Sequence, residues 1–233
     1  MTTSDRNMFL KSQLLPEQYH RKAVQGCLQA NRVHSKACEA LMRRELRRAE
    51  LNRAVFLTEL YTTRAGDQCC ELRKSQTHGL GVFATRLIAK GDAATFYPAD
   101  AIVVCPPKPY FANKVAAMLP FANVTEQDVA VYALVVQPHS EEQCAVSVVG
   151  KPLALDRSEG HLCGHMVNDA ASLHSASGTA AYLAAAFSGR NVEYEIDRGT
   201  ITLRATRDIA AGDELFAAYG ANYWLSAAAR TSR

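Results

Sequence analysis

A pair of glycines in the first half of the chain is the earliest group of residues that could bind a ligand. The run Gly79-Leu80-Gly81-Val82-Phe83-Ala84 matches the G-x-G-x-x-A pattern of dinucleotide-binding proteins. That chemistry needs a helix after the glycines, so that the pyrophosphate meets a helix N-terminus. Only seven residues separate Phe83 from Gly91, where the chain turns, and no crossover helix fits between them. We therefore interpret the motif as a turn whose backbone geometry requires glycine.

A second group has the residue types of a metal site. His161, Cys163 and His165 fall within five residues. Structural zinc sites usually have four ligands at different spacings. The seven cysteines of the chain form no C-x-C or C-x-x-C pair. We expect no bound metal, and we interpret the cysteines as mostly buried free thiols.

Three segments of the C-terminal half follow one another in a characteristic order. They are Gly164-His165-Met166-Val167-Asn168-Asp169, then Asn191-Val192-Glu193-Tyr194, then Ile209-Ala210-Ala211-Gly212-Asp213-Glu214-Leu215-Phe216-Ala217-Ala218-Tyr219-Gly220. Together with the glycine motif and the Ile88-x-x-Gly-Asp that follows it, this order resembles the SET domain family of protein-lysine methyltransferases. The resemblance covers about residues 71–224.

The resemblance implies an α+β fold that is rich in β structure. Small antiparallel sheets are expected, with a C-terminal pseudoknot in which the last segment threads past the segment that contains Asn168. The resemblance also implies a pocket for S-adenosylmethionine, the methyl donor, and a peptide groove joined to it by a channel for one lysine. The residues that it assigns to the donor are Gly79, Leu80, Gly81, Val82, Phe83, His165, Asn168, Asp169, Tyr219 and Trp224.

The assigned donor residues have different expected roles. The backbone of the glycine turn is expected to contact the methionine part of the donor. Asn168 and Asp169 are expected to hold its amino group and adenine, and His165 to pack beside the pocket. Trp224 could finish the channel or stack on adenine, and core packing explains this residue almost as well.

Three tyrosines are assigned to catalysis by the same resemblance: Tyr97, Tyr194 and Tyr219. The attacking amine must be neutral, whereas a free lysine has a pKa of about 10.4, and a desolvated channel beside a sulfonium lowers it. Tyr219 is expected to aim its hydroxyl at the amine and the methyl group. Tyr194 is expected to restrict the product to mainly monomethyl-lysine. Packing on an edge strand remains the alternative for each tyrosine.

The chain departs from the family pattern in two places. Asn168-Asp169-Ala170-Ala171 stands where the family commonly has Asn-His-Ser-Cys, and an acid there could alter donor affinity. Many members close the site with a cysteine-rich zinc cluster after the Tyr-Gly pair. The 13 residues that follow Gly220 contain no cysteine.

Hydrophobic periodicity predicts the elements that position these residues. Residues 16–61 are predicted to be helical because Met42, Leu46, Phe56 and Leu60 recur at helical spacing. Helices are also predicted at 114–119 and 126–131, and 170–187 could be a loop or a short helix. Strands are predicted at 69–74, 82–85, 94–97, 101–104, 132–137, 144–149, 192–196, 200–205 and 214–218.

We expect three parts along the chain: a basic helical extension (1–66), a SET domain (67–220) with an insertion at about 106–160, and a short aromatic tail (221–233) without a zinc cluster. Residues 1–65 hold 12 Lys and Arg against 6 Asp and Glu, although the whole chain carries only +3. This basic region could contact nucleic acid weakly, or it could be a solvated helix face that packs on the domain through its apolar stripe.

The sequence therefore predicts methyl transfer from S-adenosylmethionine to a protein lysine, with histone tails as the commonest substrates in the family. A SET-like module that binds peptide or donor without catalysis is one alternative, and a methyltransferase of a non-histone protein is another. No apolar run approaches the roughly 18 residues of a membrane helix, so no membrane contact is expected. We expect an intracellular location, with the nucleus favoured over the cytoplasm.

Overall fold

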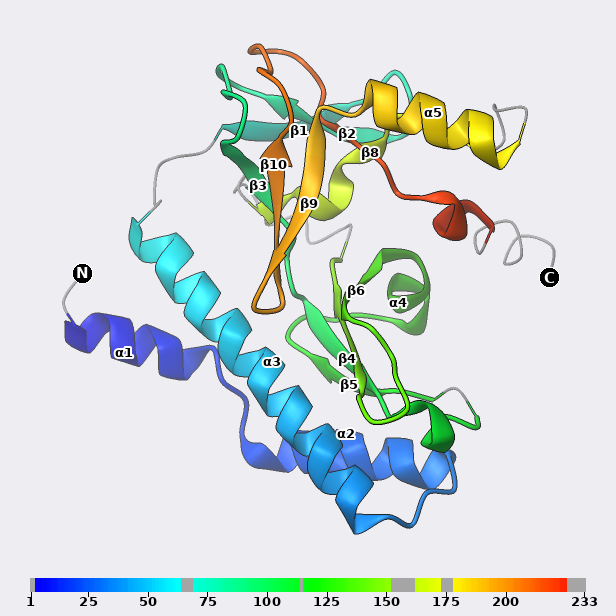
Figure 1. Ribbon diagram of the computed structural model, residues 1–233. Helices are drawn as coiled ribbons and strands as arrows, with labels where there is room; N and C mark the ends of the chain where they lie inside the picture. The colour runs from blue at the N-terminus through cyan, green and yellow to red at the C-terminus, as the bar shows by residue number, and fades with distance from the viewer. Residues whose placement is uncertain (1–2, 64–68, 114, 152–161, 173–177, 226–233) are drawn as a thin grey trace. The chain divides into compact units, whose positions relative to one another are not determined.

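The structure, a computed structural model, describes residues 3–63, 69–113, 115–151, 162–172 and 178–225. Its contacts divide the chain into two compact units, each built from segments that are distant in sequence (Figure 1). Unit 1 consists of Met1–Gly66, Pro98–Lys151 and Ile196–Thr200. Unit 2 consists of Asp67–Tyr97, Pro152–Glu195 and Ile201–Arg233.

Unit 1 combines N-terminal helices with a four-stranded antiparallel sheet. The helices are α1 (Thr3–Ser12), α2 (Glu17–Ala30) and α3 (Lys36–Thr63). The strands, in sheet order, are β5 (Ala117–Pro120), β4 (Ala101–Cys105), β7 (Ala145–Val149) and β6 (Ala133–Gln137). The short helices η1 (Lys108–Tyr110) and α4 (Glu126–Tyr132) lie between strands in the sequence.

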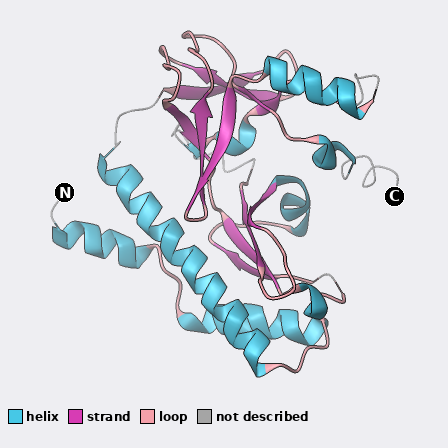
Figure 2. Cartoon of the chain, in the orientation of Figure 1, coloured by secondary structure: helices cyan, strands magenta, loops and turns pink. Residues whose placement is uncertain are grey.

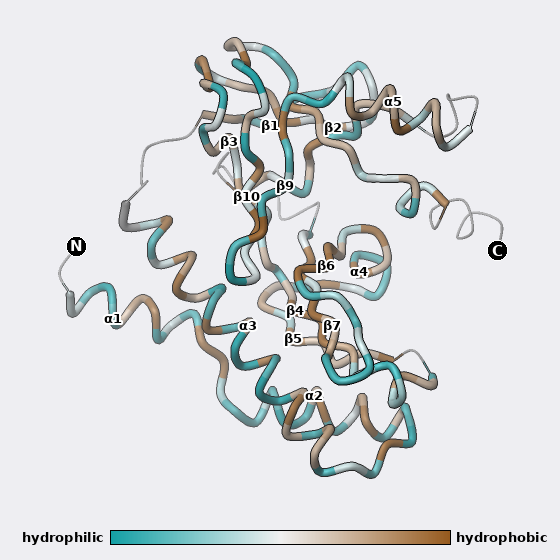
Figure 3. The backbone as a smooth tube through the Cα atoms, in the orientation of Figure 1, coloured by the Kyte–Doolittle hydropathy of each residue, from teal (hydrophilic) through white to brown (hydrophobic). Residues whose placement is uncertain are grey.

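The sheet of unit 1 is apolar on both faces, and its strands are brown in Figure 3. Side chains alternate between the faces of a strand. On one face, Ile102 and Val104 of β4 cluster with Met42 and Leu46 of α3. On the other face, Val103 packs among partly buried residues of α4. The apolar stripe of α3 is therefore buried within unit 1.

The predicted helical region 16–61 is interrupted at residues 31–35. Arg32 adopts a left-handed backbone conformation (φ 57°), which an α-helix cannot contain. Ser35 then caps the next helix, because its Oγ accepts the Cys38 N–H (3.2 Å). Helix α1 lies in the predicted helical extension (1–66), before the helical pattern predicted at 16–61. In the described part of the chain, no helix is both long enough and apolar enough to cross a membrane.

The helix predicted at 114–119 is wrong where the structure describes it. Residues Ala117–Pro120 form β5, which pairs antiparallel with β4, and Lys114 lies outside the described residues. Ala117 and Leu119 are buried on the same face, as a strand with a period of two requires. Pairing with β4 outweighs the local helical preference. The prediction of a helix at 126–131 is confirmed by α4.

Unit 2 is built from small sheets, which confirms the predicted fold class (Figure 2). Strand β1 (Cys70–Lys74) pairs with β2 (Leu80–Ala84). The second sheet has the order β3 (Ala93–Phe96), β10 (Thr200–Ala205) and β9 (Val192–Asp197). The third joins β8 (Asn168–Asp169) and β11 (Phe216–Ala217) in parallel. The helices η3 (Gly164–Met166) and α5 (Thr179–Gly189) precede β8 and β9 respectively.

The β8–β11 pairing places the C-terminal segment beside the segment that contains Asn168, as the predicted pseudoknot requires. Gly81 lies within strand β2 and no helix begins there, so the motif is not the dinucleotide fingerprint. Asp100, which occupies the approximate position of a ribose-binding acid, is instead buried and accepts the Lys151 N–H (2.7 Å).

A buried contact between a histidine and a glutamate connects α2 and α3 of unit 1. His20 Nε2 of α2 lies 2.8 Å from Glu50 Oε2 of α3, and both side chains are at most 5% exposed. The other carboxylate oxygen accepts the Leu15 N–H (2.6 Å). Removing the carboxylate would leave the Leu15 N–H and the buried His20 Nε2 without this partner, which is strongly destabilising.

We predict that Glu50→Ala lowers the free energy of unfolding by about 3–5 kcal/mol. Glu59→Ala, at an exposed position of the same helix, should change it by less than about 1 kcal/mol. Urea denaturation followed by circular dichroism measures both. Equal stability of the two variants would show that the pair does not hold the helices together.

Candidate functional site

The turn between β1 and β2 is the first part of the site. Gly79 has a φ of 52°, which side-chain-bearing residues rarely adopt. Its carbonyl accepts the Ser75 N–H (2.9 Å) and closes the turn. His78, Gly79 and Leu80 are exposed, so the backbone of this turn can be reached by a ligand.

The side chain of Asn168 is bound to this turn. Its Nδ2 donates to the carbonyl oxygens of His78 and Leu80 (both 3.1 Å) and to Glu214 Oε1 (2.9 Å). All three partners are acceptors, so they orient the amide with its nitrogen towards them. The Oδ1 of Asn168 is then the atom of this side chain that could accept a hydrogen bond from a ligand.

Glu214 completes this network, although the sequence reasoning gave it no role. Its second oxygen accepts the hydroxyl hydrogen of Ser75 (2.9 Å). A Cβ at Gly81 would lie 2.1 Å from Glu214 Oε1 and 3.1 Å from Asn168 Nδ2. The second glycine of the motif is therefore required for the close approach of two side chains. A carboxylate inside a strand-forming segment was the signal that could have identified Glu214.

Asn191 secures the C-terminal segment and was used in the sequence reasoning only to mark a position. Its Nδ2 donates to the Glu214 carbonyl (2.8 Å), and its Oδ1 accepts the Phe216 N–H (2.7 Å). The side chain is buried. It thus binds the main chain of the segment that leads into β11 in the way a neighbouring strand would.

Asp169 is buried, and its carboxylate is occupied by other groups of unit 2. Its Oδ2 accepts hydrogen bonds from the Tyr182 hydroxyl (2.6 Å), from Trp224 Nε1 (2.8 Å) and from the Tyr219 N–H (3.3 Å). Tyr182, a buried residue of α5 that the sequence reasoning missed, also accepts the Gly220 N–H (3.0 Å). Burial and the hydrogen bond to Asp169 raise the pKa of Tyr182, which keeps this phenol neutral.

The three predicted tyrosines all belong to unit 2. The Tyr219 hydroxyl donates to the Val167 carbonyl (2.7 Å). Burial raises the pKa of Tyr194, and the nearby Tyr97 phenol and Asp169 carboxylate raise it further. The phenol of Tyr194 is therefore neutral and lies within electrostatic reach of Tyr97. Tyr97 is itself buried, with its ring edge-to-face with the imidazole of His165 (centroids 6.0 Å apart).

An aromatic group follows Tyr219. Residues 221–225 are helical. The Tyr219 and Trp224 rings lie nearly parallel, with an interplanar angle of 22° and centroids 6.5 Å apart, and Tyr223 packs against Tyr219 edge-on at 4.7 Å. The Trp224 indole is therefore held by stacking on Tyr219 and by the hydrogen bond that its N–H donates to Asp169. Its stacking on adenine stays a prediction.

The cysteines of unit 2 have the environment of packing residues. Cys70 lies 4.0 Å from Cys69 (Sγ to Sγ), and this contact together with burial raises its pKa. Cys163 contacts the hydroxyl of Thr95 (3.3 Å). Among the described residues, no three His, Cys, Asp or Glu side chains are placed to hold a metal ion, and His161 lies outside those residues.

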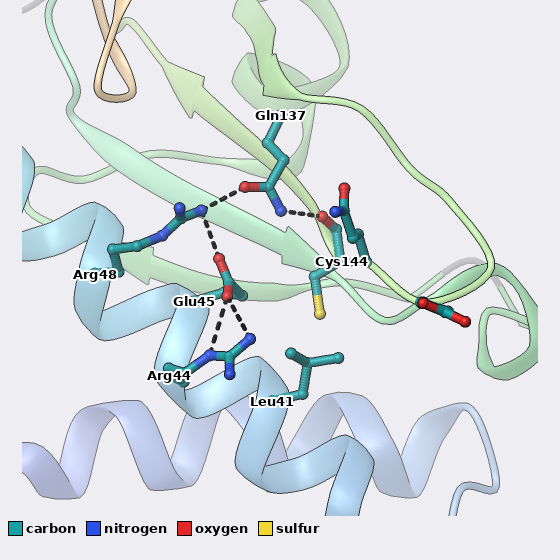
Figure 4. A pocket seen from close by; sticks show the side chains of 8 residues that line it. Leu41, Arg44, Glu45, Arg48, Gln137 and Cys144 are labelled. Atoms are coloured by element: carbon teal, nitrogen blue, oxygen red, sulfur yellow. Dashed lines mark hydrogen bonds and ion pairs between the residues drawn. The ribbon is translucent and has the colours of Figure 1, made fainter.

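A hollow of about 230 Å³ in unit 1 is a weaker candidate for a ligand site (Figure 4). Its charged side chains bind one another: Glu45 accepts from Arg44 (3.2 Å) and lies 2.5 Å from Arg48. Gln137 Nε2 donates to the Cys144 carbonyl (2.7 Å). Because these side chains already bind one another, we interpret the hollow as a polar contact between α3 and the sheet.

Comparison with known proteins gives a family for this region. Residues 79–220 match the model of the SET domain. No curated protein sequence matches the chain.

Solved structures also match. One is a Plasmodium falciparum protein described as a candidate histone methyltransferase (14% identity, TM-score 0.34, 67% of this chain and 97% of that one). A second is the methyltransferase domain of human PR domain-containing protein 2 (17% identity, TM-score 0.35, 64% of this chain and 76% of that one). A third is CpSET8 from Cryptosporidium (16% identity, TM-score 0.40, 74% of this chain and 64% of that one).

We predict that Gly81→Ala destabilises the protein by about 1–3 kcal/mol, because the new methyl group overlaps Glu214 and overpacks the network. Gly26→Ala is the matched control. Gly26 lies inside α2 with open space around it, so alanine should stabilise by roughly 0.5–1 kcal/mol. Denaturation curves of both variants test this. A Gly81→Ala protein as stable as the wild type would contradict the described packing.

Proposed function

Since the chain belongs to the SET domain family, we propose that it transfers a methyl group from S-adenosylmethionine to the side-chain amine of a protein lysine. Family membership supports methyltransferase activity. One observation carries the finer proposal: the glycine turn, Asn168 and Tyr219, distant in sequence, meet in unit 2.

The groups gathered at the turn suit a cationic ligand. The carbonyl oxygens of His78 and Leu80 and Glu214 Oε1 already accept from Asn168 Nδ2, which leaves Asn168 Oδ1 and the second lone pairs of the two carbonyls to accept from a ligand. The donor carries an ammonium group and a sulfonium, so the residues fit it. When bound, S-adenosylmethionine supplies an electrophilic methyl group. Asn168 and the backbone of the turn would hold its amino acid part, as the resemblance implies.

The tyrosines can prepare a lysine amine for this transfer. The Tyr219 hydroxyl donates its one proton to the Val167 carbonyl, so its oxygen presents lone pairs to other neighbours. It can accept an N–H of the amine and orient the nitrogen lone pair. The Tyr194 phenol stays neutral because its pKa is raised. A dry channel without an anionic phenolate favours the neutral, nucleophilic amine.

Tyr194 also supports a limit on the product. The Tyr194 hydroxyl, or a water that it binds, would occupy space that a second methyl group needs. We propose that monomethyl-lysine is the main product. The substrate that we propose is a histone tail, which would place the protein in the nucleus, and the basic helices of unit 1 could add weak contacts with nucleic acid.

Radiolabelled S-adenosylmethionine incubated with the protein and with mixed histones tests the activity. Tyr219→Phe should lower kcat by about 10²-fold or more, because it removes the oxygen that orients the amine. Tyr19→Phe, at an exposed position of α2, should leave kcat unchanged. Donor binding without transfer to any protein by the wild type would instead support a binding module without catalysis.

Mass spectrometry of the methylated product tests the role of Tyr194. Tyr194→Phe should shift the product from monomethyl- towards di- and trimethyl-lysine, because the hydroxyl no longer fills the channel. The wild type measured at equal turnover is the reference. The same product distribution in both proteins would show that Tyr194 does not set the degree of methylation.

A further inference from the structure

Asp169 makes a set of contacts that no ligand role explains. One carboxylate oxygen, Oδ2, receives hydrogen bonds from the Tyr182 hydroxyl, the Trp224 indole and the Tyr219 N–H. The other oxygen, Oδ1, receives the Ala171 N–H (3.3 Å). Both oxygens of this side chain therefore already bind other groups of the protein.

These contacts connect three pieces of unit 2 that the chain does not join directly. Tyr182 comes from α5, Trp224 from the helical residues 221–225, and Asp169 itself from β8. The Tyr182 hydroxyl closes a ring of hydrogen bonds, because it also accepts the Gly220 N–H. Hydrogen bonds to a charged acceptor are roughly twice as strong as neutral ones, so a buried carboxylate suits this junction.

Tyr219 is held at both ends by the same short segment. Its N–H donates to Asp169, and its hydroxyl donates to the carbonyl of Val167, two residues earlier. Trp224, which Asp169 also binds, lies nearly parallel to the ring of Tyr219. The position of the Tyr219 hydroxyl therefore depends on Asp169 through the main chain on one side and through the indole on the other.

We propose that Asp169 is a positioning residue. Its carboxylate clamps Tyr182, Trp224 and the main chain of Tyr219 together and thereby sets the position of the Tyr219 hydroxyl. The consequence for catalysis rests on the proposed function, in which that hydroxyl orients the amine. The clamp itself does not depend on that function. This role differs from the donor contact that the resemblance assigns to the same residue.

Trp224 is the only tryptophan of the chain, so its fluorescence reports the clamp directly. In the full-length protein, Asp169→Ala should shift the emission and raise the acrylamide quenching constant by about twofold or more, because the indole loses its acceptor. Asp169→Asn keeps one acceptor oxygen and should give a smaller change. Asp208→Asn is the matched control: this exposed carboxylate accepts the Lys90 N–H (2.8 Å) in the same unit.

Kinetics separate positioning from donor contact. For Asp169→Ala, kcat should fall by about tenfold or more while KM for the donor changes by less than about threefold, since misplacing a group costs rate. Asp169→Asn should recover part of kcat. Calorimetric titration with S-adenosylhomocysteine should give a nearly unchanged Kd.

The possible results lead to different conclusions. Emission and quenching that are unchanged in Asp169→Ala would overturn the clamp. A changed emission with unchanged kcat would overturn the positioning role, and a raised donor KM alone would assign Asp169 to the donor. If the wild type methylates no protein, the positioning role fails together with the proposed function, and the fluorescence still decides whether the clamp exists.

Discussion

The side-chain amide of Asn168 is the interaction on which the site depends. Its nitrogen binds two carbonyls of the glycine turn and the carboxylate of Glu214, so one group joins three segments distant in sequence. The approach is possible because Gly81 has no Cβ. Asn191 then binds the main chain at Glu214 and Phe216, in the segment that pairs in parallel with the one that contains Asn168. If this junction were lost, the glycine turn and Tyr219 would no longer be held in fixed positions relative to each other.

In unit 2, the Asp169 carboxylate lies among tyrosine phenols that stay neutral. The Asp169 carboxylate is buried, but several N–H and O–H donors stabilise its charge. Its presence helps to raise the pKa of Tyr182 and Tyr194. The same carboxylate that orders the aromatic group therefore helps to keep those phenols uncharged, as the proposed channel for a neutral amine would require.

The acidic and basic side chains of the helices in unit 1 differ in how far they are buried. Of the six acidic residues before position 66, Glu45 and Glu50 are buried and bound to basic side chains. Arg44 and Arg47, by contrast, keep at least 70% of their side chains exposed. The apolar stripe of these helices is buried against the sheet.

The sequence by itself determined the family, through motifs whose order and spacing are specific, and it predicted most strands, because alternation and turn residues are local signals. It failed at residues 117–119, where pairing with β4 decides the structure. It did not identify Glu214, Asn191 or Tyr182 as parts of the site, and it could not show that Asp169 binds Trp224. Those contacts join residues 13 to 55 positions apart, and only the folded chain brings the donors and acceptors within hydrogen-bonding distance.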